Sequence, residues 1–155
     1  KRIGQKEKDV SFLMVGDGPL REQVEVQLQQ AGLSDRTVLT GLRRDIPSLL
    51  ACMDIFVHTS LWEGLPRAIV QAMCMRLPVL AYSADGVQEI IQNGVNGYIF
   101  KPGEMDGMAE VCEQLVHHPE LRKALGQRGR ERVIQEFDLQ KMIAQISALY
   151  DQFIT

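Results

Sequence analysis

Five short apolar runs alternate with segments of helical periodicity along the first 100 residues of the chain. The runs have the length and the β-branched or aromatic content of buried strands, and Gly, Pro, Asn or Asp residues bound them. They cover residues 10–15, 37–41, 54–60, 77–83 and 97–100. Because most of them are nearly continuous in apolar residues, they are typical of parallel strands that are covered on both faces.

The segments between the runs place apolar residues three and four positions apart, as amphipathic helices do. The predicted helices cover residues 19–31, 45–53, 66–76 and 85–91. We expect Asp45 to cap the second of them, and Asp85 with Gln88 resembles a capping box for the fourth. After residue 103 no further strand is expected, and three helices are predicted over residues 104–117, 119–136 and 138–152.

This order of elements predicts an α/β fold, a doubly wound parallel sheet that is Rossmann-like, with about five strands and a helical C-terminal tail. The 155 residues suit a single domain over residues 1–155 with a hydrophobic core of its own. Ligands of such sheets bind outside the carboxyl ends of the strands. The loops expected to carry function are therefore residues 16–19, 41–45, 59–66 and 83–87.

Composition and charge narrow the classes of function. Apolar residues make up 45% of the chain and charged residues 24%, which is ordinary for a globular domain. The net charge of −3 provides no overall basic field for nucleic acid. No apolar run approaches the length of a membrane helix and no signal peptide opens the chain. We therefore expect a cytoplasmic protein that binds no nucleic acid, with contact at the inner face of the membrane left open.

The segment VGDGPLR, residues 15–21, places Gly16 and Gly18 between a predicted strand and a predicted helix. A dinucleotide-binding fingerprint has this beginning, but Arg21 takes the place of its third glycine. The strand that ends near Thr40 also lacks the acidic residue that such a fold uses at a ribose. Two interpretations remain, a tight turn alone or a turn whose Gly16 and Asp17 also contact a ligand.

The segment LWEGLPRAIVQAM, residues 61–73, is the strongest candidate site. Glu63 follows a strand, and Gly64 allows the backbone to approach a ligand closely. Pro66 suits the first turn of the next helix, whose unpaired N–H groups and dipole attract an anion. Arg67 and Gln71 are four residues apart and share one helix face. The set suits a ligand with hydroxyls and phosphates; the plainer alternative is that Glu63 only caps the helix.

Taken together, these segments resemble the C-terminal half of a group 1 glycosyltransferase. The resemblance runs from Val10 to about Phe137, through VGDGPLR, TVLTGLRRDIPSLLACMDIFVHTS, EGLPRAIVQAM and LPVLAYSADGVQEIIQNGVNGYIFKPGE. Members of this family are retaining enzymes built from two Rossmann-like domains. The resemblance implies a nucleotide-sugar-binding domain of an enzyme that transfers a sugar to an acceptor hydroxyl, in the synthesis of a cell-surface polysaccharide or glycolipid.

The resemblance also assigns roles to site residues. Glu63 matches the first of two glutamates in the family signature and would be the catalytic contact to hydroxyls of the donor sugar. Backbone amides at Gly64, Leu65 and the turn at Pro66–Arg67 would bind the sugar and the diphosphate. The second glutamate, which holds the ribose, falls on Gln71. We expect this departure to cost about 1 kcal/mol, because hydrogen bonds to an amide are neutral.

Further donor contacts and cofactors follow from the same resemblance. We expect Gly16 and Asp17 to lie near the donor, together with Arg43, for which loop charge alone is the alternative. No metal and no other cofactor is expected. A packed strand residue is the favoured interpretation of His58, ahead of a contact in the site.

The family pattern extends beyond this sequence. The first strand–helix unit of the domain, with basic residues for the diphosphate, should precede Val10, and an N-terminal acceptor domain should form the other wall of the cleft. Expected partners are therefore a UDP- or GDP-linked sugar, an acceptor saccharide or lipid-linked saccharide, and the protein's own N-terminal domain. The basic run at residues 122–132 is interpreted as a solvated helix face or as a contact with an anionic membrane surface.

Two alternative functions stay open at this point. The same architecture would permit a nucleotide-sugar epimerase or a phosphorylase, because a fold does not determine a reaction. The chain could also be a non-catalytic domain whose sugar site has decayed, with Gln71 as the first sign. In each case we expect the isolated domain to be inactive.

Overall fold

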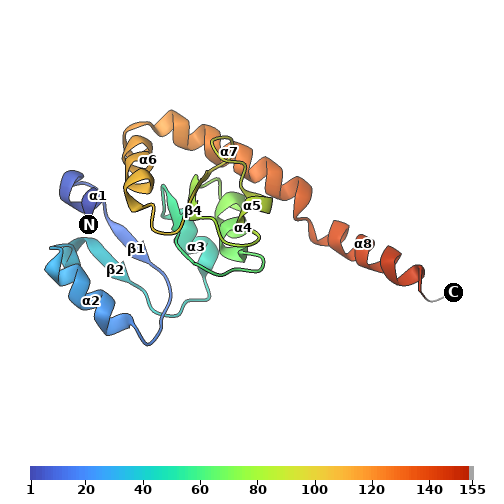
Figure 1. Cartoon of the computed structure of the whole chain (residues 1–155), viewed down its shortest axis with the longest axis horizontal. Coiled ribbons are helices and arrows are strands. Elements are labelled where there is room, and N and C mark those ends of the chain that lie inside the picture. Colours follow the sequence, from blue (N-terminus) through green and yellow to red (C-terminus); the bar gives the residue numbers. More distant parts are fainter. Residues whose placement is uncertain (154–155) are drawn as a thin grey trace.

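Parallel strands alternate with helices between residues 12 and 100 of the protein, seen in a computed structural model that describes residues 1–153 (Figure 1). The strands are β1 (Phe12–Met14), β2 (Thr37–Leu39), β3 (Phe56–His58), β4 (Val79–Tyr82) and β5 (Tyr98–Phe100). The helices between them are α2 (Arg21–Gln30), the 3-10 turn η1 (Ser34–Arg36), α3 (Ile46–Ala51), α4 (Arg67–Cys74) and α5 (Val87–Ile90). The predicted α/β fold with five strands is confirmed.

The five strands are all parallel, and their hydrogen bonds form two sheets. β1 pairs with β2, while β4 lies between β3 and β5. In Figure 1, β1 lies on the side of β2 that faces the three-stranded sheet. Within the described residues, β1 and β3 therefore each pair along one edge only. All four residues of β4 are buried, whereas Val57 in β3 is 47% exposed.

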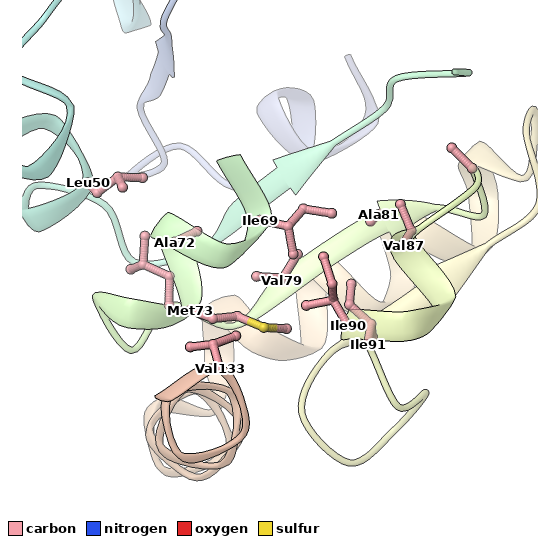
Figure 2. Packing of buried hydrophobic residues seen from close by; sticks show 12 residues of the cluster. Leu50, Ile69, Ala72, Met73, Val79, Ala81, Val87, Ile90, Ile91 and Val133 are labelled. Carbon is pink, nitrogen blue, oxygen red and sulfur yellow. The ribbon is translucent and has the colours of Figure 1, made fainter. Parts of the chain in front are cut away.

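Two hydrophobic clusters cover the two faces of the three-stranded sheet, because side chains alternate along β4. Val79 and Ala81 belong to the cluster formed with α4 and α5, which Figure 2 shows. Leu80 and Tyr82 belong to the opposite cluster, which includes residues of α6 (Met105–His117) and α7 (Pro119–Glu136). The core therefore sits around the second sheet, and this sheet is the rigid support for the loops at its carboxyl end.

Helix α1 (Arg2–Lys6), which the hydrophobic pattern did not predict, ties the first part of the chain to α6. Arg2 pairs with Asp106 at 3.0 Å, and Lys6 with Glu113 at 2.8 Å. The hydrogen bond from Lys6 holds the pKa of Glu113 below its ordinary value. The Arg36 guanidinium also donates to backbone carbonyls at the end of α1. A helix of this length carries too little periodicity to be recognised in the sequence.

Helix α7 covers the ends of three other helices with its arginines. Arg122, Arg130 and Arg132 donate to backbone carbonyls at the C-terminal ends of α6, α4 and α5, respectively. Such contacts satisfy carbonyls that have no partner within their own helix and place positive charge at the negative end of the dipole. Neither interpretation of the basic run holds for these three residues, because they act as structural donors.

Two predicted helix caps are wrong. Asp45 occupies the N-cap position of α3, but its carboxylate binds Arg43 at 2.5 and 2.7 Å and makes no bond to the helix. The guanidinium two residues earlier takes the carboxylate oxygens that would otherwise accept from the backbone. At α5 the N-cap is Gly86, with φ of 76°, and not Asp85. A left-handed backbone at this position suits glycine.

The helical tail ends in α8 (Leu139–Asp151), which begins where the Asp138 carboxylate accepts from the N–H of Lys141 at 3.0 Å. Figure 1 shows α8 extending away from the sheets. No residue of α8 is buried. The predicted helical tail is confirmed, and the apolar side chains of α8 are exposed.

The contact of α4 with α7 requires glycine on α7. Arg76, directly after α4, has a left-handed φ of 59°, and its carbonyl oxygen lies 1.9 Å from where a Cβ on Gly126 would be. A side chain at Gly126 must therefore push α7 away from the end of α4.

We predict that Gly126→Ala lowers the free energy of unfolding by about 1–3 kcal/mol, because it overpacks a backbone contact. The matched control is Gly107→Ala in α6, where the nearest atom is a flexible Glu104 side-chain oxygen at 3.3 Å. Alanine should there be neutral or stabilise by roughly 0.5–1 kcal/mol, through helix propensity. Urea unfolding of both variants measures the difference, and equal midpoints would contradict the packing argument.

Candidate functional site

Glu63 lies in the loop between β3 and α4, at the carboxyl end of the three-stranded sheet. Its Oε1 is 2.9 Å from Nε2 of His58, the last residue of β3. The His58 ring stacks on Phe56 with centroids 6.2 Å apart and planes 14° apart. The side chains of His58 and Glu63 are 18% and 26% exposed. The carboxylate is thus partly sheltered and held by a ring that a strand positions.

The loop rests on the start of α5. A Cβ on Gly86 would lie 1.9 Å from the carbonyl oxygen of Gly64 and 3.3 Å from Pro66 Cδ. Pro66 is fully buried, whereas a Cβ on Gly64 would meet nothing within 4 Å. The inner side of the loop is therefore in close contact with α5, and its outer side is open to a ligand.

Backbone amides at the start of α4 provide the elements of an anion site. The N–H groups of Gly64, Leu65 and Ala68 donate to no protein acceptor within residues 1–153. The N–H of Arg67 donates to the Leu65 carbonyl at 2.8 Å, and Pro66 has no N–H. Ala68 was missed because its side chain carries no chemistry. Its position in the first turn of a helix that follows a proline was the only available sign.

The solvent face of α4 carries two polar residues, as the spacing predicted. Arg67 and Gln71 are exposed, one helical turn apart. Ile69 and Met73 lie on the opposite, buried face, against β4 and α7 (Figure 2). A cation and a neutral amide therefore follow Glu63 along the surface of one helix.

The other predicted donor residues lie in the loops that follow the strands of the two-stranded sheet. The Gly16 N–H donates to the Gly41 carbonyl at 3.1 Å, and the Asp17 carboxylate accepts from the Gly18 N–H at 2.8 Å. Arg43 is bound to Asp45, and this guanidinium holds the pKa of that carboxyl below its ordinary value. No hydrogen bond or ion pair of the described residues joins residues 12–45 to residues 56–91. The structure brings Gly16 and Asp17 beside Gly41, and does not link them to Glu63.

Residues 1–153 contain no group of three or more His, Cys, Asp and Glu side chains placed to hold a metal ion. None of the helices in that range combines the length and the hydropathy needed to span a bilayer.

The model of the family "glycosyl transferases group 1" matches residues 1–132. This chain belongs to that family. Its relatives include the alpha-D-kanosaminyltransferase of Streptomyces kanamyceticus, 30% identical over 150 residues, which are 96% of this chain and 39% of that protein. A second is the UDP-Gal:alpha-D-GlcNAc-diphosphoundecaprenol alpha-1,3-galactosyltransferase of Escherichia coli, 29% identical over 92% of this chain and 37% of that protein.

Solved structures of similar proteins share the fold of this chain. The crystal structure of Anabaena HepE in complex with UDP-glucose matches with a TM-score of 0.86 and 30% identity, over 92% of this chain and 41% of that one. The chain spans about two fifths of the length of these relatives. The resemblance to group 1 glycosyltransferases expected from the sequence is confirmed.

The contact between Gly86 and Gly64 generates a prediction about the loop. Gly86→Ala should lower the free energy of unfolding by about 1–3 kcal/mol, because it adds a Cβ at a positive φ and against a backbone oxygen. Gly64→Ala, with no neighbour within 4 Å, should change it by less than about 0.5 kcal/mol. Thermal unfolding measures both, and amide NMR shifts of residues 59–68 should move in Gly86→Ala well beyond the substituted residue. Unchanged amide shifts of the loop in Gly86→Ala would contradict a close contact between the loop and the start of α5.

Proposed function

We propose that this chain is the donor-binding domain of a retaining glycosyltransferase. The enzyme moves a sugar from a nucleotide-sugar to an acceptor hydroxyl, in the synthesis of a cell-surface polysaccharide or glycolipid. The observation that carries the proposal is that Glu63, held by His58, lies beside backbone amides before and at the start of α4 that have no protein acceptor within residues 1–153. UDP-glucose in the similar HepE structure supports a UDP-linked donor ahead of a GDP-linked one.

The two halves of the site suit the two halves of such a donor. The Glu63 carboxylate accepts hydrogen bonds from sugar hydroxyls and favours positive charge at the anomeric carbon as the bond to the diphosphate breaks. The N–H groups of Gly64, Leu65 and Ala68, at the positive end of α4, stabilise the charge that develops on the leaving diphosphate. The acceptor oxygen then forms the new bond to the anomeric carbon, on the face from which the diphosphate leaves, and its hydroxyl proton passes to the leaving diphosphate oxygen.

Further contacts follow along α4. Arg67 supplies a positive charge one turn before Gln71. The Gln71 amide accepts from one ribose hydroxyl and donates to the other. Gly16 and Asp17 approach the donor from the loop after β1, and Arg43 does so once it leaves Asp45. No protein metal site is part of this proposal.

Family membership bears on the alternatives. An epimerase or a phosphorylase of similar architecture requires that the likeness stop at the fold. Here the family match spans residues 1–132, and both relatives are named as transferases. A decayed site is also disfavoured, because Glu63 keeps a specific partner and the loop keeps its open amides.

The unpaired strand edges support a larger domain. In doubly wound sheets of order 3-2-1-4-5-6, strand 1 separates strands 2 and 3 from strands 4 to 6. The pair β1–β2 corresponds to strands 2 and 3, and β3–β4–β5 corresponds to strands 4 to 6. We propose that a strand–helix unit elsewhere in the protein inserts between β1 and β3 and brings both sets of loops onto one donor.

The exposed face of α8 supports a second missing part, the acceptor domain. Large apolar side chains recur on this helix at spacings of three and four, and all are exposed. They are Leu139, Met142, Ile143, Ile146 and Leu149. A stripe of this kind normally faces another part of the protein. The proposed occupant is the enzyme's own N-terminal domain, which the relatives' greater length allows.

The acceptor is proposed to be a saccharide, either free or lipid-linked. The name of the E. coli relative specifies a diphosphoundecaprenol-linked acceptor for that protein. An acceptor of this kind would bring the enzyme from the cytoplasm to the inner face of the membrane. The basic run of α7 contributes little to such a contact, since three of its arginines bind backbone carbonyls.

The proposed function predicts that Glu63→Gln in the full-length enzyme lowers transfer roughly hundredfold or more, because it removes charge from the transition-state contact. UDP affinity should stay within about threefold, since the carboxylate faces the sugar and not the nucleotide. Glu120→Gln, an exposed residue of α7 paired with Lys123, is the matched control. Product formation from a UDP-sugar and an acceptor, followed by NMR at the anomeric proton, is the measurement.

Three results of that experiment would count against the proposal. Near-normal transfer in Glu63→Gln would refute the site. An inverted anomeric configuration would refute the retaining reaction. Conversion of the nucleotide-sugar without an acceptor, in the unmodified enzyme, would support the epimerase instead.

The proposed missing strand predicts a change in hydrogen exchange. Extending the chain at its N-terminus by the preceding strand–helix unit of the same protein should slow amide exchange at Leu13 in β1 and Val57 in β3 together. Pairing of both free edges is the physical reason. Leu80 in the middle of the second sheet serves as control, since it is paired on both sides already. Slower exchange in only one of the two strands would contradict an insertion between them.

A further inference from the structure

The contact between His58 and Glu63 extends the proposed function, on which this inference rests. We propose that His58 is a positioning residue for the catalytic carboxylate. It donates a hydrogen bond from Nε2 to Oε1 of Glu63, at 2.9 Å, and so sets the direction of that carboxylate beside the start of α4. The role differs from packing within a strand, because it acts on the reaction through Glu63.

The two partners differ in how firmly the fold holds them. His58 ends β3 and pairs in register with Ala81 of the fully buried strand β4. Its ring lies parallel to that of Phe56, two residues earlier on the same face of the strand. Glu63 lies in the loop that follows, beyond the exposed Leu61 and Trp62. The histidine is therefore the fixed member of the pair, and the carboxylate takes its position from it.

The chemistry of the two side chains allows this hydrogen bond in one direction only, from His58 to Glu63. A carboxylate offers acceptors only, so the hydrogen must lie on Nε2 of the imidazole. The neutral tautomer with hydrogen on Nε2 meets this requirement without any net charge on the ring. Oε2 of Glu63 has no protein partner within residues 1–153 and is left for a sugar hydroxyl. One oxygen thus serves positioning and the other serves the donor.

Loss of the bond frees a flexible side chain near the reacting carbon. A misplaced catalytic group loses rate even where the substrate still binds. A hydrogen bond to a charged group is strong enough for its loss to lower a rate roughly ten- to hundredfold. The effect should appear in kcat for transfer, and the affinity for UDP without sugar should hardly change.

The test compares His58→Gln with His58→Asn in the full-length enzyme. A glutamine amide places its N–H near the position of Nε2, whereas an asparagine amide places it near Nδ1, too far from Glu63. We expect His58→Asn to lower kcat roughly ten- to hundredfold. His58→Gln should recover most of kcat, and UDP affinity should stay within about twofold in both. Equal kcat values in the two variants, per mole of folded enzyme measured by thermal unfolding, would overturn the proposal.

A double-mutant cycle separates positioning through Glu63 from any independent effect of His58. In the Glu63→Ala background, where no carboxylate is left to position, His58→Asn should change kcat of the residual transfer by no more than about twofold. An undiminished effect in that background would overturn the inference. Normal transfer in His58→Asn, with transfer lost in Glu63→Gln, overturns this inference alone. Normal transfer in Glu63→Gln overturns the proposed function.

Discussion

The buried face of α4 is the constraint on which the site depends. Ile69, Ala72 and Met73 are fully buried between β4 and α7, so α4 has one position relative to the sheet. The end of α4 is fixed as well, because the carbonyl of Arg76 contacts α7 at Gly126 and the carbonyl of Cys74 accepts from Arg130. Its beginning, with Pro66 buried, then leaves the loop after β3 little freedom. Packing far from any ligand thus directs the open amides of the loop.

The proposed binding of a diphosphate relies on the start of α4 and not on a cluster of basic side chains. The chain carries a net charge of −3, and Glu63 adds a negative charge to the loop itself. In that proposal the main attraction comes from backbone N–H groups and the dipole of α4. Because these donors belong to the backbone, substitution of nearby side chains changes them little.

Much of the fold follows from periodicity, and the misses share a physical cause. The strands and the helices over residues 104–152 were predictable because burial imposes a spacing that reads directly in the sequence. The choice of a side chain between two possible hydrogen-bond partners leaves no such spacing in the sequence. Asp45 could cap α3 or bind Arg43, and the arginines of α7 could face water or reach carbonyls of three other helices. Only three-dimensional neighbours decide between such choices.

The residues of the candidate site also fall into those that the sequence predicts and those that only three-dimensional neighbours reveal. Glu63, Gly64 and Gln71 were predicted because their positions relative to a strand end and a helix start carry meaning in sequence. Ala68 was not predicted, since it acts through its backbone. A site contact of His58 was only the less favoured interpretation, since it depends on the direction in which β3 ends. The two sheets add a further limit. Pattern recognition counted five strands correctly, but the pairing of each edge depends on which strands stand beside it.

Charge at the site gives a consistent role to the departure at Gln71. A second glutamate at this place would put two carboxylates near the proposed diphosphate, one at Glu63 and one at residue 71, a turn into α4. The amide removes one of these charges while keeping both an acceptor and a donor for ribose hydroxyls. In the proposed complex Arg67, on the same face, would act on the phosphates with no carboxylate at residue 71 to neutralise it. In the proposed complex, weaker hydrogen bonds to the ribose would thus be offset by stronger electrostatic attraction for the diphosphate, so binding of the donor would shift toward its phosphates.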